Sequence, residues 1–198
     1  RWAAAQPASE TPGHMDLPFS FRYQGRPFAE VQSGWSVHRS QRQIDPHLLE
    51  HTLRLTGDTA GLDVRCTAVA YDDFPVVEWT LTFANGGTKP TDLIEDVQAL
   101  DAILTPAKGE CRLHHWTGDD CSPGSYAPAS SALPPGIDLR FAPHGGRPTT
   151  GAFPYFNLER PGGGVCVVVG WPGQWAAQFA RAPDSGVRVR AGQELTRF

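Results

Sequence analysis

The residues of this chain best suited to chemistry lie together in one segment, which reads Cys-Arg-Leu-His-His-Trp-Thr-Gly-Asp-Asp-Cys from Cys111 to Cys121. It combines thiols, imidazoles, carboxylates and an indole, the groups used in metal sites, acid–base catalysis and sugar recognition. Long irregular connections that concentrate such side chains are often binding sites. Three kinds of chemistry are therefore open to this segment.

A zinc site would draw on the cysteines and on His114 and His115, with the spacing Cys-x2-His-His-x5-Cys. That spacing lacks the paired Cys-x2-Cys knuckles of structural zinc sites, so we predict no metal and no cofactor. Cys111 and Cys121 could instead close their loop as a disulfide. The other two cysteines, Cys66 and Cys166, fall in strand-like runs, where buried free thiols are expected.

The neighbouring carboxylates Asp119 and Asp120 could be read as a catalytic pair. Retaining glycoside hydrolysis needs two carboxyl groups about 5 Å apart on either side of the scissile bond. Adjacent residues point to opposite sides of an extended chain, so we predict no catalytic residue here. Two interpretations remain: the carboxylates bind sugar hydroxyls while Trp116 covers a sugar ring, or they cap amides of their own loop.

A second candidate is the stretch from Gly151 to Trp175, in which two aromatic groups flank Asn157 and Glu159. Flat apolar faces beside fixed polar groups suit a sugar, but a hairpin with core aromatics has the same composition. We interpret this hairpin as largely structural. The predicted ligand-binding residues are therefore Trp116, Asp119, Asp120, His115 and Trp171.

The elements that must position these residues are strands. Glycine and proline are abundant (21 and 18 residues), and period-two alternation of apolar side chains recurs, most clearly from Val77 to Phe83. We predict an all-β, large antiparallel β-sandwich with few or no helices, in which Trp35 is a core residue and 110–148 is mostly irregular. The expected extended segments are 17–23, 28–40, 49–56, 62–71, 77–83, 94–104, 137–141, 165–169, 174–181 and 187–190.

Three groups of residues together resemble the N-terminal region of bacterial α-galactosidases of glycoside hydrolase family 36, in clan D. They are Trp116-Thr-Gly-Asp-Asp-Cys121, then Gly145-Gly-Arg-Pro148 with Gly151-Ala-Phe-Pro-Tyr-Phe-Asn-Leu158, and Gly162-Gly-Gly-Val165 with Gly170-Trp-Pro-Gly-Gln-Trp175. The resemblance implies a β-supersandwich followed by a catalytic (β/α)8 barrel. It also implies that the two catalytic aspartates of the retaining mechanism lie in the barrel, and the chain shows no βα alternation that could form one.

The expected organisation is thus a segment 1–16, flexible or left by an expression tag, and a single sandwich domain 17–198. In the parent protein we expect the barrel to follow it. The chain itself is expected to be inactive and to pack on that barrel, with the 114–121 loop lent to the pocket of a galactoside-type carbohydrate. The alternative is a free-standing carbohydrate-binding module.

Charge and hydropathy restrict the other partners. The formal net charge is −4 with no basic run, so nucleic acid is not an expected partner. No apolar run approaches the roughly 20 residues of a membrane span. A sandwich separated from its barrel would expose the former interface, so a homo-oligomer is expected. Residue patterns do not assign a compartment, and both the cytoplasm and secretion by a bacterium fit.

Overall fold

The chain is described by a computed structural model covering residues 15, 17–57, 61–104, 109–182 and 186–198. It is nearly all β, as predicted. Contacts divide it into two compact units, 1–16 with 22–94 and 17–21 with 95–198, which are described separately below. The prediction for segment 1–16 lies outside the described residues except at Met15, whose backbone N–H donates to Gln32 Oε1 at 3.2 Å. The single domain 17–198 stays a prediction.

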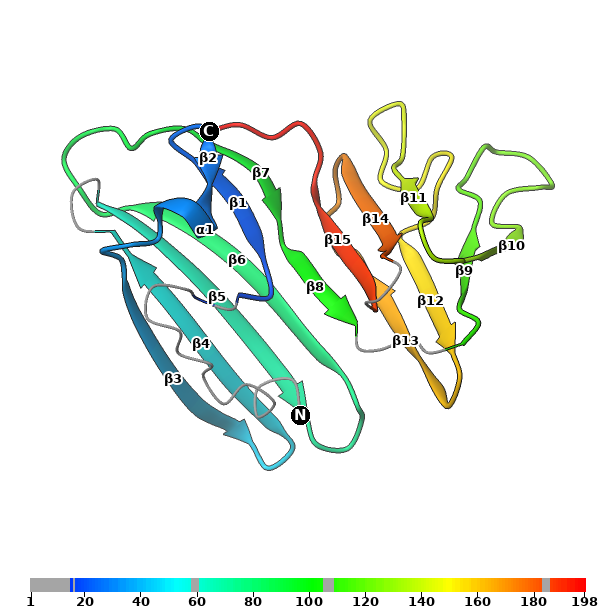
Figure 1. Cartoon of the computed structure of the whole chain (residues 1–198), viewed down its shortest axis with the longest axis horizontal. Helices are drawn as coiled ribbons and strands as arrows, with labels where there is room; N and C mark the ends of the chain where they lie inside the picture. The colour runs from blue at the N-terminus through cyan, green and yellow to red at the C-terminus, as the bar shows by residue number, and fades with distance from the viewer. Residues whose placement is uncertain (1–14, 16, 58–60, 105–108, 183–185) are drawn as a thin grey trace. The chain divides into compact units, whose positions relative to one another are not determined.

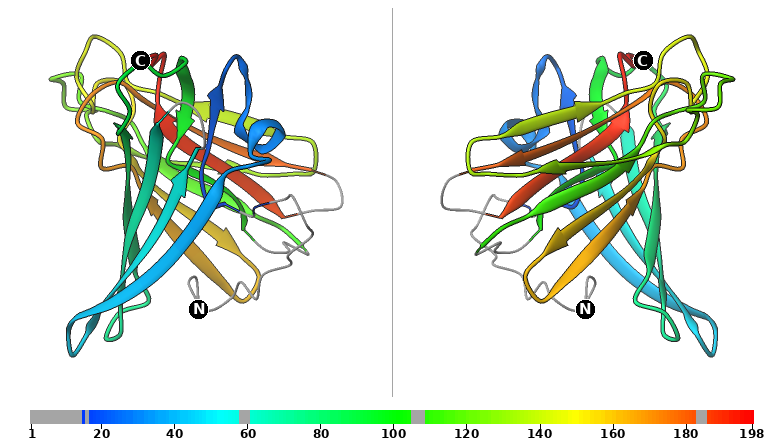
Figure 2. Two further views of the ribbon diagram at one scale, coloured as in Figure 1. Left: turned by 90° about the vertical axis from the view of Figure 1, so that its left-hand side faces the viewer. Right: turned by 90° about the vertical axis from the view of Figure 1, so that its right-hand side faces the viewer.

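The first unit is built on a four-stranded antiparallel meander in the order β3-β4-β5-β6. Its long strands run side by side in Figures 1 and 2. The bounds are β3 Ser36–Asp45, β4 Leu48–Thr56, β5 Leu62–Tyr71 and β6 Val77–Asn85. A small hairpin precedes them, in which β1 (Ser20–Tyr23) pairs with β2 (Arg26–Pro27).

The meander has one apolar and one polar face, as its alternation predicts. Leu62, Val64 and Cys66 of β5 are buried. Opposite-charge pairs bridge neighbouring strands on the polar face, and the Arg54 Nε–H donates to the Asp63 carboxylate at 2.8 Å. The acidic pair Asp72 and Asp73 lies exposed in the β5–β6 connection.

The prediction of an extended segment 28–40 is wrong in its first part. The helix α1 spans Phe28–Val31, and β3 begins only at Ser36. Phe28 and Val31 lie three residues apart, a spacing that places them on one side of a helical turn and on opposite sides of a strand, and Pro27 starts that turn. Trp35 packs edge-on against the ring of Phe28, with centroids 4.9 Å apart, but it is partly buried and not the core residue that was predicted.

The second unit contains two four-stranded antiparallel sheets, in the orders β10-β9-β12-β13 and β11-β14-β15-β8. Strand β7, Ile94–Gln98, leads into it. The bounds are β8 Leu100–Leu104, β9 Arg112–Trp116, β10 Pro128–Ala132, β11 Asp138–Phe141, β12 Tyr155–Arg160, β13 Gly163–Val168, β14 Trp175–Arg181 and β15 Val187–Gln193. The expected irregular region 110–148 therefore holds two strands, β9 and β10, that the sequence analysis missed.

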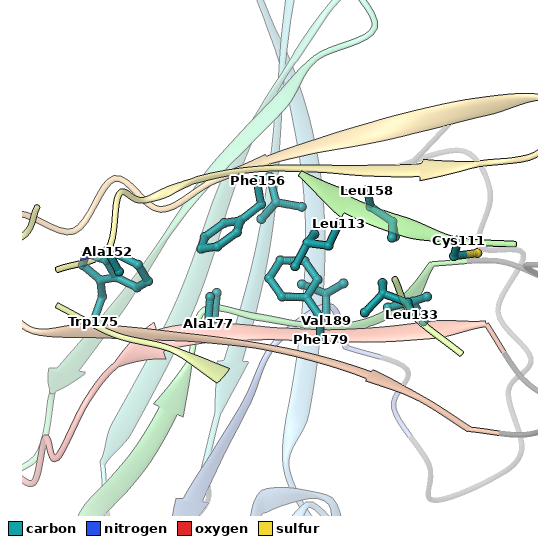
Figure 3. Packing of buried hydrophobic residues seen from close by; sticks show 13 residues of the cluster. Cys111, Leu113, Leu133, Ala152, Phe156, Leu158, Trp175, Ala177, Phe179 and Val189 are labelled. Atoms are coloured by element: carbon teal, nitrogen blue, oxygen red, sulfur yellow. The ribbon is translucent and has the colours of Figure 1, made fainter. Parts of the chain in front are cut away.

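The two sheets enclose one hydrophobic core, shown in Figure 3. Phe156 and Leu158 of β12 face Phe179 of β14, and the ring centroids of Phe156 and Phe179 are 5.0 Å apart. Trp175 is fully buried and its Nε1–H donates to the carbonyl of Pro148 at 2.7 Å. Burying aromatic and aliphatic side chains of this size is the main stabilisation such a sandwich has.

The outer side of the second sheet is charged. Strand β15 alternates buried valines with Arg188 and Arg190, which confirms its predicted wet face. The Arg188 guanidinium donates to both oxygens of Asp101, at 2.8 and 3.0 Å, and Ser20 Oγ–H donates to the same carboxylate at 2.7 Å. Burial of Asp101 raises its pKa, but the hydrogen bonds from Arg188 and Ser20 outweigh it, so the net pKa is lowered.

The four cysteines are free thiols in the structure. Cys111 is buried in the core and Cys121 is exposed, so the alternative of a disulfide between them is not realised. Cys66 is buried, as expected, and burial raises its pKa to about 12. Cys166 is exposed on β13, contrary to the prediction, because the outward positions of that strand alternate with the buried Val167.

Candidate functional site

The 116–127 loop connects β9 to β10 and closes on itself. The Thr117 backbone N–H donates to the Ala127 carbonyl at 3.0 Å, and the Ala127 N–H donates to Thr117 Oγ1 at 2.8 Å. These two bonds continue the β9–β10 pairing by one step, so the nine residues between Thr117 and Ala127 form a compact loop. Figure 1 shows this loop projecting beyond the ends of β9 and β10.

Asp119 is committed to the loop's own backbone. Its Oδ1 accepts hydrogen bonds from the Cys121 N–H at 2.9 Å and from Ser125 Oγ at 3.1 Å. The Cys121 amide is the main reason that the pKa of Asp119 is lowered; Ser125 adds to it, and smaller contributions come from Arg147 and Tyr126. The capping interpretation of Asp119 is thus realised, while a ligand contact stays a prediction.

Asp120 is exposed at the tip of the loop, and its backbone N–H donates to Ser125 Oγ at 3.1 Å. The Ser125 hydroxyl therefore contacts both aspartates: it donates to the Asp119 carboxylate and accepts from the Asp120 backbone N–H. The side chain of Asp120 is exposed to solvent, whereas that of Asp119 is partly buried. The two carboxylates thus have different surroundings.

A tight backbone approach fixes the loop against the β11–β12 connection. The Asp119 N–H donates to the Thr149 carbonyl at 2.7 Å. A Cβ atom on Gly118 would lie within 3.0 Å of backbone atoms of Thr149, Gly151 and Ala152, so only glycine fits there. Two motifs quoted for the family resemblance, one around Gly118 and one around Gly151, are therefore direct neighbours.

His114 and His115 point to opposite sides of β9. His115 faces the core, where its ring lies 4.6 Å from that of Phe141 and its Nε2 is 3.1 Å from Ser131 Oγ. Burial, followed by the charge of His114, lowers the pKa of His115. His114 faces outward, with Nε2 2.7 Å from Glu159 Oε2. The predicted ligand residue His115 therefore lies on the inner side of the sheet.

Trp116 lies on the outer side of the sheet, two residues beyond His114. The Phe153 N–H donates to the Trp116 carbonyl at 3.3 Å. The register of β9 and β12 shifts between the His114–Asn157 pair and the Thr117–Ala152 bridge, so residues 153–155 bulge opposite Trp116. This bulge brings an aromatic segment next to the predicted loop.

The bulged segment carries a stacked pair of rings. The centroids of Phe153 and Tyr155 are 4.8 Å apart with planes at 13°, and Tyr126 packs edge-on against Phe153 at 5.2 Å. Tyr126 and Tyr155 are each 46% exposed. The sequence analysis did not single out Tyr126, although an aromatic residue in a Pro/Ser-rich loop was a usable signal.

The last predicted site residue, Trp171, lies in the β13–β14 connection, which begins beside the bulged segment, where the Val169 N–H donates to the Pro154 carbonyl at 3.0 Å. It is 45% exposed, whereas Trp175, four residues later, is fully buried. Its indole nitrogen lies beside Gly173, where a Cβ atom would come within 3.0 Å. The structure thus keeps Trp116, Asp119 and Asp120 in one loop and places His115 on the inner side of the sheet. Within the described residues, no three His, Cys, Asp or Glu side chains are grouped as metal ligands.

Neither a protein-family model nor a curated protein matched this sequence. Solved structures did match. The galactosidase domain of the α-galactosidase–sucrose kinase AgaSK is 13% identical with a TM-score of 0.64, and 93% of this chain aligns with 27% of that one. An α-galactosidase from Lactobacillus brevis is 10% identical, with a TM-score of 0.67 and the same coverages.

The family 36 α-galactosidase AgaA from Geobacillus stearothermophilus is 12% identical with a TM-score of 0.57, and 93% of this chain aligns with 29% of that one. This chain therefore spans 27 to 29% of the length of the galactosidases that it matches. No described helix is long and apolar enough to cross a membrane. The chain has the fold of the N-terminal β-sandwich domain of family 36 α-galactosidases.

Proposed function

We propose that this chain is the non-catalytic N-terminal sandwich domain of an α-galactosidase-like retaining glycoside hydrolase, and that it packs on the catalytic barrel of its parent protein. One observation carries the proposal: nearly the whole chain, 93%, aligns with only 27 to 29% of each galactosidase. The catalytic residues then belong to the remaining part of the parent protein, and the substrate is a galactoside.

The candidate site supports a non-catalytic role. Retaining hydrolysis requires two carboxyl groups about 5 Å apart on opposite sides of the scissile bond. Asp119 holds an amide and a hydroxyl of its own loop, and Asp120 is its direct neighbour in the chain. Within this proposal, the Trp116–Asp120 loop lies at the rim of the sugar pocket, where the exposed Asp120 accepts hydrogen bonds from sugar hydroxyls and Trp116 covers a ring face.

The activity of a longer product of the same gene tests this proposal. The chain alone should release no nitrophenol from p-nitrophenyl α-galactoside, and a product that includes the following coding region should release it. In the longer protein, Asp120→Asn should raise KM with little change in kcat, and Gly124→Ala in the same loop is the matched control. Nitrophenol release by the chain alone, abolished by Asp120→Asn, would refute the proposal, as would a following region without βα repeats.

Self-association is a further part of the proposal. A sandwich domain that normally packs on a barrel leaves an apolar surface uncovered when it is expressed by itself. The isolated chain should therefore form weak dimers, visible by sedimentation velocity as a sedimentation coefficient that rises with concentration. A constant monomer value up to the highest attainable concentration would contradict this part.

The second candidate, a free-standing carbohydrate-binding module, has one observation in its favour. The rings of Tyr126, in the β9–β10 loop, and of Tyr155, on β12, remain half exposed, whereas Phe156 beside Tyr155 is buried. Such a module would bind saccharide in the absence of any other domain. Titration of the isolated chain with galactose and raffinose distinguishes this candidate from a purely architectural domain.

A further inference from the structure

The outer face of the β9–β12 sheet, meaning the side turned away from the core, carries a row of aromatic rings. Leu113 and His115 of β9 point inward, so Trp116 points outward, and on the neighbouring strand Phe153 and Tyr155 lie on the same side. The inward neighbour Phe156 is 2% exposed, against 46% for Tyr155. Tyr155 is therefore exposed and Trp116 and Phe153 are partly buried, although the core beside them is fully packed.

A polar row continues the aromatic row along the same face. His114 Nε2 lies 2.7 Å from Glu159 Oε2, and Asn157 is the partner of His114 in the β9–β12 register. A Cβ atom on Gly164 would lie 3.2 Å from Asn157 Oδ1, so the carboxamide lies over a glycine that leaves it room. This row offers both donors and acceptors at fixed positions.

The aromatic row and the polar row are connected through strand β12. Alternate residues of a strand lie on one side, roughly 6.6 Å apart, so Tyr155 and Asn157 of β12 follow one another along the outer face. The ring of Phe153, from the bulged segment before the strand, stacks on that of Tyr155. Phe153 covers one side of the Tyr155 ring at 4.8 Å. Asn157, the next outward residue of β12, and the His114–Glu159 pair lie on the same face, so the exposed ring and these polar groups share one surface.

We propose that this outer face binds a pyranose ring of a neutral saccharide, with an apolar C–H face of the sugar on Tyr155 and its hydroxyls at Asn157 and the His114–Glu159 pair. Aromatic rings beside planar polar groups match a ligand with apolar faces and hydroxyl edges. One carboxylate, Glu159, faces one imidazole, which favours an uncharged ligand over an anion or a cation. The identification of the sugar as a galactoside rests on the proposed function, whereas the proposal that this face binds a saccharide does not.

Calorimetric titration of the full chain tests this inference, with methyl α-galactoside and raffinose as ligands and methyl α-glucoside for comparison. We expect a Kd of about 1 mM for the galactosides. Tyr155→Ala should weaken binding about tenfold, because the stacking ring is lost, and Tyr155→Phe should keep it. Asn157→Ala should weaken binding as well. Phe74→Ala removes an exposed aromatic residue of the first unit, in the β5–β6 connection, and should leave the affinity unchanged.

The outcomes separate this inference from the proposed function. Heat with a galactoside that Tyr155→Ala abolishes and Phe74→Ala retains supports the inference. Absence of heat with every saccharide overturns it, while the nitrophenol assay still decides the role of the domain. Binding that depends on Asp120 but not on Tyr155 also overturns it in favour of the loop. A dimer that Tyr155→Ala dissociates would instead identify the face as a protein interface and overturn the sugar site.

Discussion

Replacing Gly118 by alanine is the sharpest test of how the candidate loop is held. The backbone of residue 118 passes so close to the β11–β12 connection that an added Cβ atom would lie within 3.0 Å of three backbone atoms, Thr149 O, Gly151 N and Ala152 N. Backbone atoms cannot rotate away as the end of a side chain can. The loop or the connection must therefore move.

The cost follows from what such a movement breaks. Inserting a methyl group into a packed site costs about 1–3 kcal/mol. Separation of the two segments also removes the bond from the Asp119 N–H to the Thr149 carbonyl, 2.7 Å long, worth about 1 kcal/mol. Alanine reduces the entropy of the unfolded chain and returns about 0.4–1 kcal/mol. We expect Gly118→Ala to destabilise the second unit by about 1–3 kcal/mol.

Gly124→Ala is the matched control in the same loop. A Cβ atom there meets only Ser122 Oγ, at 3.7 Å, which is ordinary contact. Only the unfolded-state contribution then remains, so this variant should be neutral or slightly stabilising. Urea unfolding followed by tryptophan fluorescence measures both variants, and amide hydrogen exchange at Asp119 shows whether the loop itself has opened.

The difference in unfolding midpoint between the two variants tests whether the loop and the β11–β12 connection are in close contact. If Gly118→Ala and Gly124→Ala have the same unfolding midpoint, and the Asp119 amide exchanges equally slowly in both, the close approach of the loop to the β11–β12 connection is not as described. The family resemblance would then rest on segments that are not in contact.

Three other predictions follow from the same structure. Trp175→Ala should cost about 3–5 kcal/mol because its side chain is fully buried, whereas Trp171→Ala should lie within about 0.5 kcal/mol of the parent; equal unfolding midpoints would contradict this. Because the pKa of Asp119 is lowered in the folded chain, its carboxylate stabilises the fold at pH values above its unfolded pKa of 3.8. This stabilisation is lost as the pH falls through the folded pKa, so the urea midpoints of the parent and of Asp119→Asn should converge in acid. Ellman's reagent should modify the exposed Cys121 and Cys166 first, and Cys66 and Cys111 only in denaturant; early labelling at Cys66, whose pKa is about 12, would contradict its burial.

Strands with strong alternation were predictable from the sequence, and weakly patterned ones were not. Val77 to Phe83 confirms its pattern in β6, because one face of that strand is apolar and the other carries Glu78 and threonines. Strand β10, with the sequence Pro-Ala-Ser-Ser-Ala, has no β-branched or aromatic residue. It is a strand only because it pairs with β9, a tertiary effect that local sequence does not contain.

The candidate site was predictable only where its contacts join residues that are close in sequence. Capping by Asp119 is a local interaction between residues 119, 121 and 125, and the sequence analysis included it. The neighbourhood of Trp116 and Tyr155 depends on a register shift between strands 39 residues apart in the chain, which no local pattern reveals. The Gly151–Trp175 stretch therefore contains both kinds of residue: Trp175 is core, and Tyr155 is surface.

The charged ladder of Arg188 and Asp101 on one outer side of the second unit has a consequence for orientation. The opposite outer side carries the exposed Tyr155 together with Asn157 and the His114–Glu159 pair, so on that side an aromatic ring lies among polar groups. On an apolar resin, the side that carries Tyr155 should adsorb preferentially, with the Arg188–Asp101 side left in water. Salt screens the ionic contacts of the charged side, so raising the ionic strength should shift adsorption further toward the aromatic ring.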